Sequence, residues 1–148
     1  MLILSFAGVV IFISCKKDKE DNATKTEIEL LTMGSWKCTA STINSAYDYY
    51  GDGTVATKFF DIMKSSEKND FETYKTNGIW EYNEGSTKCD QSYPQIFSEP
   101  WSFAANETKL FVGTVEHKIL ELTATTLKLR YTFEDDGVIY TEEDTYSH

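Results

Sequence analysis

Hydrophobic and polar residues alternate along most of the chain after residue 34. The clearest alternation is at residues 127–133, where leucine, leucine, tyrosine and phenylalanine are separated by lysine, arginine and threonine. A two-residue period places the apolar side chains on one face of a β-strand. The pattern therefore predicts an all-β domain of about eight strands. The other segments of this kind, each bounded by turn residues, are 36–40, 71–76, 79–83, 101–105, 110–112, 118–122 and 138–146.

Short connections between these strands predict an antiparallel up-and-down meander with one buried face. Closing the meander into a small barrel would remove the exposed strand edges, and a two-sheet sandwich of the same strands is the alternative. A short helical turn is expected at residues 27–33, before the first strand. Residues 54–64 are ambiguous, although the apolar side chains at 59–63 would lie on one side of a short helix.

Asn77-Gly78 is the strongest hairpin signal in the chain. This dipeptide favours a two-residue type I′ turn, which would place Thr76 opposite Ile79. A four-residue turn would shift this register. With the two-residue turn, one face of the hairpin carries Phe71, Thr73, Trp80 and Tyr82, and the other carries Glu72, Tyr74 and Glu81.

The N-terminal segment predicts a lipid anchor. Residues 2–13 form an apolar run that is too short to span a bilayer, and Ser14-Cys15 at its end looks like a bacterial lipobox. We expect residues 1–14 to be a signal peptide, Cys15 to be diacylated, residues 15–26 to be a charged flexible tether and residues 27–148 to be the barrel domain. The alternative is an uncleaved helix with an incidental cysteine. Lys16, in place of aspartate, favours the outer membrane, at its periplasmic face or at the cell surface.

The charge of the chain limits its partners. Its 148 residues include 24 acidic and 14 basic side chains, which give a formal net charge of −10. This charge argues against nucleic acid and against an anionic membrane surface, so the membrane partner is expected to be reached through the lipid alone. It also makes a neutral or cationic apolar ligand more plausible than a fatty-acid anion.

Catalytic and metal-binding motifs are not found in the sequence. His117 has no second histidine two or four residues away, so we expect it to be exposed to solvent and expect no metal site. Residues 142–144 are acidic and are expected to form a solvated strand edge. We therefore expect the protein not to be an enzyme and to need no cofactor.

An ordered series of short motifs lies between residues 29 and 146. It consists of Leu30-Leu31 with Gly34-Ser35-Trp36, Lys68-Asn69-Asp70-Phe71, residues 82–90, Ile119-Leu120-Glu121-Leu122 and Thr125-Thr126-Leu127-Lys128-Leu129. This series resembles the lipocalin-like domains of bacterial lipoproteins. The resemblance implies a small antiparallel barrel that binds a small hydrophobic ligand. In that family a cysteine before the Lys-Asn-Asp-Phe motif faces the later cysteine. Ser65-Ser66 stands there in this chain, so the family's disulfide cannot be carried over.

Two interpretations of the barrel follow. In the first, its interior binds a small hydrophobic ligand, and a tyrosine-rich loop forms the entrance. In the second, bulky side chains fill the interior, and the loop at 46–53 contacts a protein partner whose identity is unknown. Cys38 and Cys89 form an even pair if Cys15 is lipidated, and they either form a disulfide or remain separate thiols. The expected interior residues are Trp36, Trp80, Tyr82, Trp101, Phe103, Leu127, Leu129 and Tyr131, and the expected entrance residues are Tyr47, Tyr49 and Tyr50.

Overall fold

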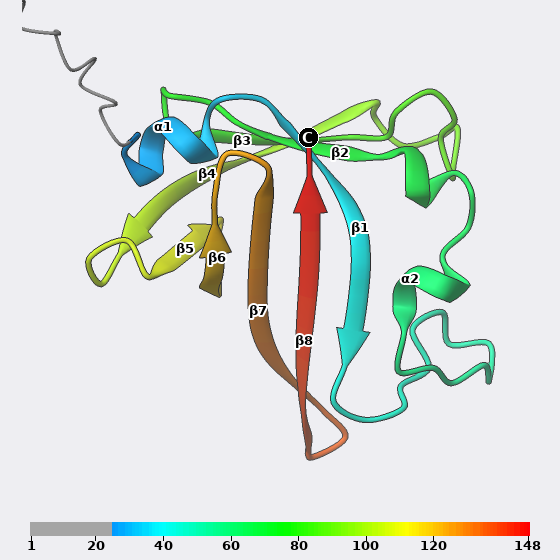
Figure 1. Ribbon diagram of the computed structural model, residues 1–148. Helices are drawn as coiled ribbons and strands as arrows, with labels where there is room; N and C mark the ends of the chain where they lie inside the picture. Colours follow the sequence, from blue (N-terminus) through cyan, green and yellow to red (C-terminus); the bar gives the residue numbers. More distant parts are fainter. Residues whose placement is uncertain (1–24) are drawn as a thin grey trace, which may run out of the picture.

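The computed structural model describes residues 25–148 (Figure 1). The predicted signal peptide, the predicted lipidation site Cys15 and all but the last two residues of the predicted tether lie outside the described residues. Within residues 25–148, no helix is long and apolar enough to cross a bilayer.

Eight antiparallel strands form a closed barrel (Figure 1). Each strand pairs with the next one along the chain, and the last strand pairs with the first. The predicted all-β up-and-down barrel is therefore confirmed, and the sandwich alternative is wrong. The strands are β1 (Ser35–Ile43), β2 (Phe71–Tyr74), β3 (Ile79–Asn83), β4 (Ile96–Ala104), β5 (Lys109–Val112), β6 (Val115–Leu122), β7 (Thr126–Asp135) and β8 (Val138–Ser147).

Three short helical segments accompany the strands: α1 (Glu27–Leu31), α2 (Phe59–Ile62) and the 3₁₀ turn η1 (Glu67–Asn69). The first of these corresponds to the helical turn expected at 27–33. It begins with a capping box, in which Thr26 accepts from the backbone N–H of Glu29 and the Glu29 carboxylate accepts from the backbone N–H of Thr26. The second lies beside β1 (Figure 1).

The core lies at the end of the barrel near α1. Trp36 is fully buried there, and its indole Nε1 donates a 2.9 Å hydrogen bond to the carbonyl oxygen of Leu31. This bond attaches α1 to the first strand, so the helix covers that end of the barrel. The buried members of the core are Leu31, Trp36, Tyr74, Leu110, Leu127 and Leu129.

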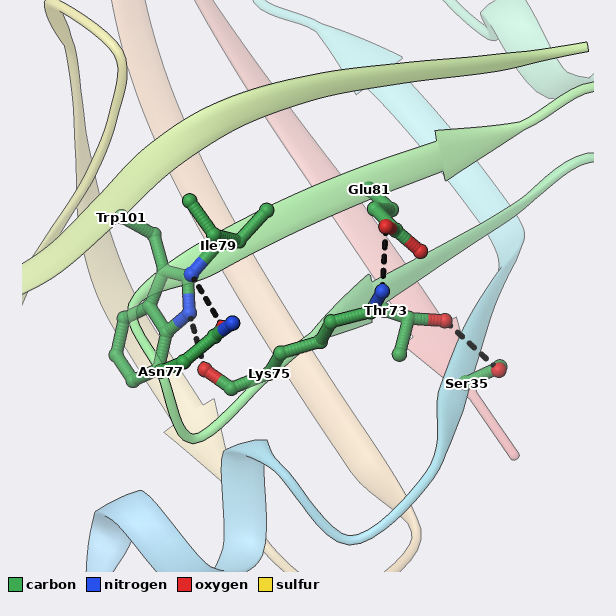
Figure 2. A network of polar contacts seen from close by, with 7 residues as sticks. All are labelled: Ser35, Thr73, Lys75, Asn77, Ile79, Glu81 and Trp101. Atoms are coloured by element: carbon green, nitrogen blue, oxygen red, sulfur yellow. Dashed lines mark hydrogen bonds and ion pairs between the residues drawn. The ribbon is translucent and has the colours of Figure 1, made fainter.

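The β2–β3 hairpin has a different turn from the one predicted (Figure 2). The backbone N–H of Gly78 donates to the carbonyl of Lys75 at 3.0 Å, and Gly78 has a φ of 80°. The loop between the strands therefore has three residues, 76–78, instead of two. It is a type I turn that ends in a left-handed glycine, in place of the type I′ turn. Tyr74 consequently lies opposite Trp80, one position away from the predicted register.

The corrected register exchanges the two faces of β2. Thr73 faces outward, where its hydroxyl lies 2.9 Å from that of Ser35 (Figure 2). Glu72 and Tyr74 face the barrel interior together with Trp80, because a shift of one residue moves every side chain of a strand to the opposite face.

A β-bulge changes the alternation of β1. The register with β8 shifts between Cys38 and Ala40. Cys38 faces the interior, but the extra residue leaves Ala40 exposed and buries Ser41 instead. The unbroken alternation predicted for residues 36–40 is therefore wrong at Ala40.

Candidate ligand site in the barrel interior

The first cavity, cavity 1, lies where β1 and β2 diverge. The two strands pair at Ser35–Thr73 and Trp36–Glu72, and β1 then continues against β8. Residues 44–70, including α2 and η1, run beside this gap. The cavity there has a volume of about 240 Å³. It is lined by Trp36, Cys38, Tyr49, Met63, Glu67, Asp70, Phe71, Glu72, Tyr82, Tyr131, Glu142, Asp144 and Tyr146.

The second cavity, cavity 2, adjoins the first and has a volume of about 410 Å³. The two cavities share Glu72, Tyr131 and Tyr146. The interior is therefore incompletely filled by side chains on both sides of these three residues. The rest of the lining of cavity 2 is Tyr74, Trp80, Glu99, Val112, Val115, His117 and Leu129.

Glu72 lies between the two cavities and is held by hydrogen bonds. Its Oε2 atom accepts from the Trp80 indole Nε1 and from the Tyr74 hydroxyl, both at 2.9 Å. Burial raises the pKa of the Glu72 carboxyl, although the hydrogen bonds from Trp80 and the tyrosines act in the opposite direction. A carboxylate with this number of donors has a fixed position in the barrel wall.

Glu142 and Asp144 bring two more carboxyls into the interior from β8. The prediction that residues 142–144 form a solvated strand edge is wrong, because β8 pairs with both β1 and β7. Glu142 is buried, and its Oε1 atom accepts from the Ser41 hydroxyl at 2.8 Å. Glu143 alone faces outward, where it forms ion pairs with Lys128 and Arg130. Burial, followed by the neighbouring Glu142 carboxylate, raises the pKa of Asp144 to about 7.

Asp70 lies just before β2 and lines cavity 1. Its side chain is almost completely enclosed, with a residue exposure of 7%. Oδ2 accepts a 2.5 Å hydrogen bond from the Tyr82 hydroxyl, whereas Oδ1 is buried without a hydrogen-bond partner. Burial raises the pKa of this carboxyl, and the hydrogen bond from Tyr82 opposes the shift. One oxygen of Asp70 is thus left without the partner that buried polar atoms normally have.

The structure brings six of the predicted interior and entrance residues to a cavity wall: Trp36, Tyr49, Tyr82 and Tyr131 at the first cavity, and Trp80, Leu129 and again Tyr131 at the second. Two other predicted interior residues, Trp101 and Phe103, pack partly buried against the core instead. The Trp101 indole Nε1 donates to the Lys75 carbonyl at 2.9 Å (Figure 2), so this ring supports the hairpin. Leu127 is fully buried in the core.

The tyrosines of the loop after β1 differ in their roles. Tyr49 is 45% exposed and reaches cavity 1. The Tyr47 ring instead packs against Phe133 and Tyr140, with ring centroids 5.3 Å and 4.8 Å away. The Tyr50 hydroxyl donates to the Glu67 carboxylate. Of the three, only Tyr49 therefore both reaches a cavity and is exposed to solvent.

Cys38 and Cys89 are free thiols in separate surroundings. Cys38 lines cavity 1, and burial raises its pKa to about 12. Cys89 is exposed, and its Sγ atom lies 2.7 Å from the Ser66 hydroxyl oxygen. In the structure Cys38 and Cys89 are therefore separate thiols without a disulfide, and Cys89 faces Ser66.

His117 does not project into solvent as predicted. It lines cavity 2, and its Nδ1 atom is buried without a hydrogen-bond partner. Burial lowers the pKa of this imidazole. Among residues 25–148, no group of three or more His, Cys, Asp or Glu side chains is arranged to hold a metal ion.

The residues missed from the sequence are mostly the acidic ones. Two-residue alternation through Glu142, Asp144 and Tyr146 places them on one face, which was an available signal. Their charge, however, predicts the solvent side when faces are assigned from burial preferences.

No protein-family model matches this chain, and no curated protein matches its sequence.

Proposed function

We propose that this protein is a lipid-anchored outer-membrane or cell-surface lipoprotein whose barrel binds a small hydrophobic ligand. The observation that carries the binding proposal is the pair of adjoining cavities of about 240 and 410 Å³ in the barrel interior. The larger lies within the usual range for small-molecule sites, about 300–1,000 Å³, and the smaller extends it. The motif series that resembles the lipocalin-like lipoproteins supports the same proposal, as does the eight-stranded closed barrel.

The walls suit an amphipathic molecule. Aromatic rings of Trp36, Tyr82 and Trp80 supply apolar surface, while carboxyl and hydroxyl groups supply a few fixed polar positions. Binding would proceed by transfer of the ligand from water into the barrel, with Tyr49 at the solvent side of the smaller cavity.

The alternative is a barrel without a small-molecule ligand that contacts a protein through its outer loops. The tyrosine-rich loop gives it limited support, because Tyr47 and Tyr50 are engaged with Phe133, Tyr140 and Glu67. This alternative also expects a packed interior with no cavity large enough for a ligand, which differs from the two cavities described above.

Native mass spectrometry of the protein as its own host produces it, purified in a non-ionic detergent, tests the proposal. A ligand-binding barrel retains a small molecule that is released on unfolding. The recovered compound should then change the emission of Trp36 and Trp80 when it is added back, and Trp80→Phe should reduce that change. An empty barrel, together with no fluorescence response to a panel of apolar compounds, would support the protein-contact alternative.

A further inference from the structure

The formally charged side chains that line the two cavities are all acidic. The lining of cavity 1 contains five carboxyl side chains, and that of cavity 2 contains Glu99 besides the shared Glu72. No lysine or arginine is among the described residues that line either cavity. The basic side chains of the barrel wall lie outside, as in the ion pairs of Lys128 and Arg130 with Glu143. The five carboxyl residues of cavity 1 are Glu67, Asp70, Glu72, Glu142 and Asp144.

These carboxyls differ in how well the protein satisfies them. Glu72 accepts from Trp80 and Tyr74, and Glu142 accepts from Ser41, so both have structural partners. Asp70 is 7% exposed, yet its Oδ1 atom is buried with no partner. A buried acceptor without a donor costs free energy that folding does not recover, and a ligand that donates a hydrogen bond there removes the cost.

We infer that the ligand is an amphipathic organic cation, whose protonated amine enters cavity 1 and donates to Asp70, attracted by the other carboxyls of the lining such as Asp144, and whose apolar part extends along the aromatic walls. This inference rests on the proposed ligand-binding function and specifies the ligand's chemistry. An ammonium group has only donors, which matches a site whose charged groups are all acceptors. A carboxylate ligand would meet the same acidic groups and be repelled.

The aromatic residues of the smaller cavity fit the same ligand. Trp36, Tyr49 and Tyr131 line it together with the carboxyls, and aromatic faces attract cations. A metal ion is a poorer candidate, because no set of three or more suitable side chains in residues 25–148 converges to coordinate one. The carboxyls instead surround a volume that accommodates an organic group.

The test compares octylamine, 1-octanol and octanoate, which share one alkyl chain and differ in the charge of the head group. Each is titrated into the full-length chain at about pH 8 in a constant concentration of non-ionic detergent, with tryptophan fluorescence as the readout. We expect octylamine to bind at least about tenfold more tightly than 1-octanol, and octanoate to bind most weakly.

Two variants locate the amine. Asp70→Asn keeps the shape of the side chain and an acceptor for Tyr82, and Asp144→Asn removes the second charge. Each should reduce the affinity for octylamine about tenfold and leave that for 1-octanol unchanged. Asp136→Asn, in the exposed turn between β7 and β8, removes the same charge outside the barrel and should have little effect. Near-ultraviolet circular dichroism checks that each variant is folded. If one of the two interior variants does not fold, the other is sufficient to test the amine site.

The outcomes separate this inference from the proposed function. If 1-octanol or octanoate binds as tightly as octylamine, or if Asp136→Asn acts like the interior variants, the cation site is wrong although the barrel still binds ligands. If no probe binds and no molecule is retained in native mass spectrometry, the proposed function fails as well.

Discussion

The Sγ atom of Cys89 lies 2.7 Å from the Oγ atom of Ser66, which joins the loop after β3 to the turn before η1. Ser66→Cys should therefore form a disulfide with Cys89. The expected stabilisation from closing a loop of this length is about 3 kcal/mol by the chain-entropy estimate. Thiol titration and thermal unfolding with and without a reductant measure both effects.

Ser65→Cys is the control for this cross-link, since the neighbouring side chain is not the one that contacts Cys89. It should leave Cys89 free to react with thiol reagents. If the Ser66→Cys protein also retains its full number of reactive thiols after air oxidation, the contact between these two loops is incorrect.

Gly85 allows the loop after β3 to approach η1. It has a φ of 59°, and a Cβ atom there would overlap both the carbonyl oxygen and the side chain of Asn69. Gly51 has a similar φ of 67° but open space around it. Both glycine-to-alanine changes incur the cost of a left-handed residue, so Gly85→Ala should lower the free energy of unfolding by about 2 kcal/mol more than Gly51→Ala. Urea denaturation compares the two, and equal losses would argue against the close approach.

Titration of Asp144 should stabilise the ligand-free barrel as the pH falls from about 8 to 6, whereas the lowered pKa of His117 acts in the opposite direction in this range. The folded-state pKa of Asp144 is raised from 3.8 to about 7, so the folded protein binds a proton in this range that the unfolded chain does not bind. The contribution of Asp144 should be roughly 1 kcal/mol, measured as the difference between the unchanged protein and Asp144→Asn in urea denaturation at the two pH values. The titratable groups around Asp144 are Glu142, Glu72, Cys38, Tyr49, Tyr131 and Tyr146.

Asp144→Asn should remove the Asp144 contribution, because an amide does not titrate, and leave the opposite dependence of His117. Glu143→Gln is the matched control on the outer face of the same strand. The pKa of Glu143 is lowered by hydrogen bonds from Lys128 and Arg130, so its titration opposes the predicted trend and lies at lower pH. A change in stability between pH 8 and 6 that is the same in Asp144→Asn as in the unchanged protein would contradict the raised pKa of Asp144.

Trp36 should be among the most important residues for stability. It is fully buried, it donates a hydrogen bond to Leu31, and its ring centroid lies 3.8 Å from that of His148. Trp36→Ala should cost about 3–5 kcal/mol in denaturant titration. Tyr93, 58% exposed, offers an aromatic control whose replacement by alanine should cost less than about 0.5 kcal/mol. A loss below 1 kcal/mol at Trp36 would be inconsistent with its place in the core.

The anchor prediction concerns residues outside the described part of the chain. Cys15→Ala should abolish partitioning of the protein into a detergent phase, because the thiol that would carry the lipid is gone. Cys89→Ala should partition like the unchanged protein. Partitioning that survives Cys15→Ala, with residues 1–14 still present in the mass spectrum, would show that the protein is not a lipoprotein of this kind.

Most strand positions and the up-and-down order followed from the sequence because both depend on local pattern, although β4 begins at Ile96, before its predicted start at residue 101. Alternation at 127–133 and 138–146 defined the long β7–β8 pair, and the Asn77-Gly78 dipeptide located a hairpin where one exists. Short turns between successive strands favour neighbours in space, so an up-and-down order needed little further information.

The face that each strand presents to the interior was less predictable. One extra residue in the turn at 76–78 moved Glu72 from the predicted outer face into the interior, and the bulge between Cys38 and Ala40 had a comparable effect in β1. Such shifts cost little locally, yet each reverses every side chain of a two-residue repeat.

The sequence by itself therefore determined an all-β chain of alternating strands, with Trp36 at its first core position. Only the tertiary structure decided that Asp70, Glu72, Glu142 and Asp144 surround one cavity. These residues come from separate strands and a loop, and a carboxyl's usual preference is for water. Closure of β8 against β1 overrides that preference. With a partner strand on each side, β8 has one face toward solvent and one toward the interior, and the register places Glu142 and Asp144 on the inner face.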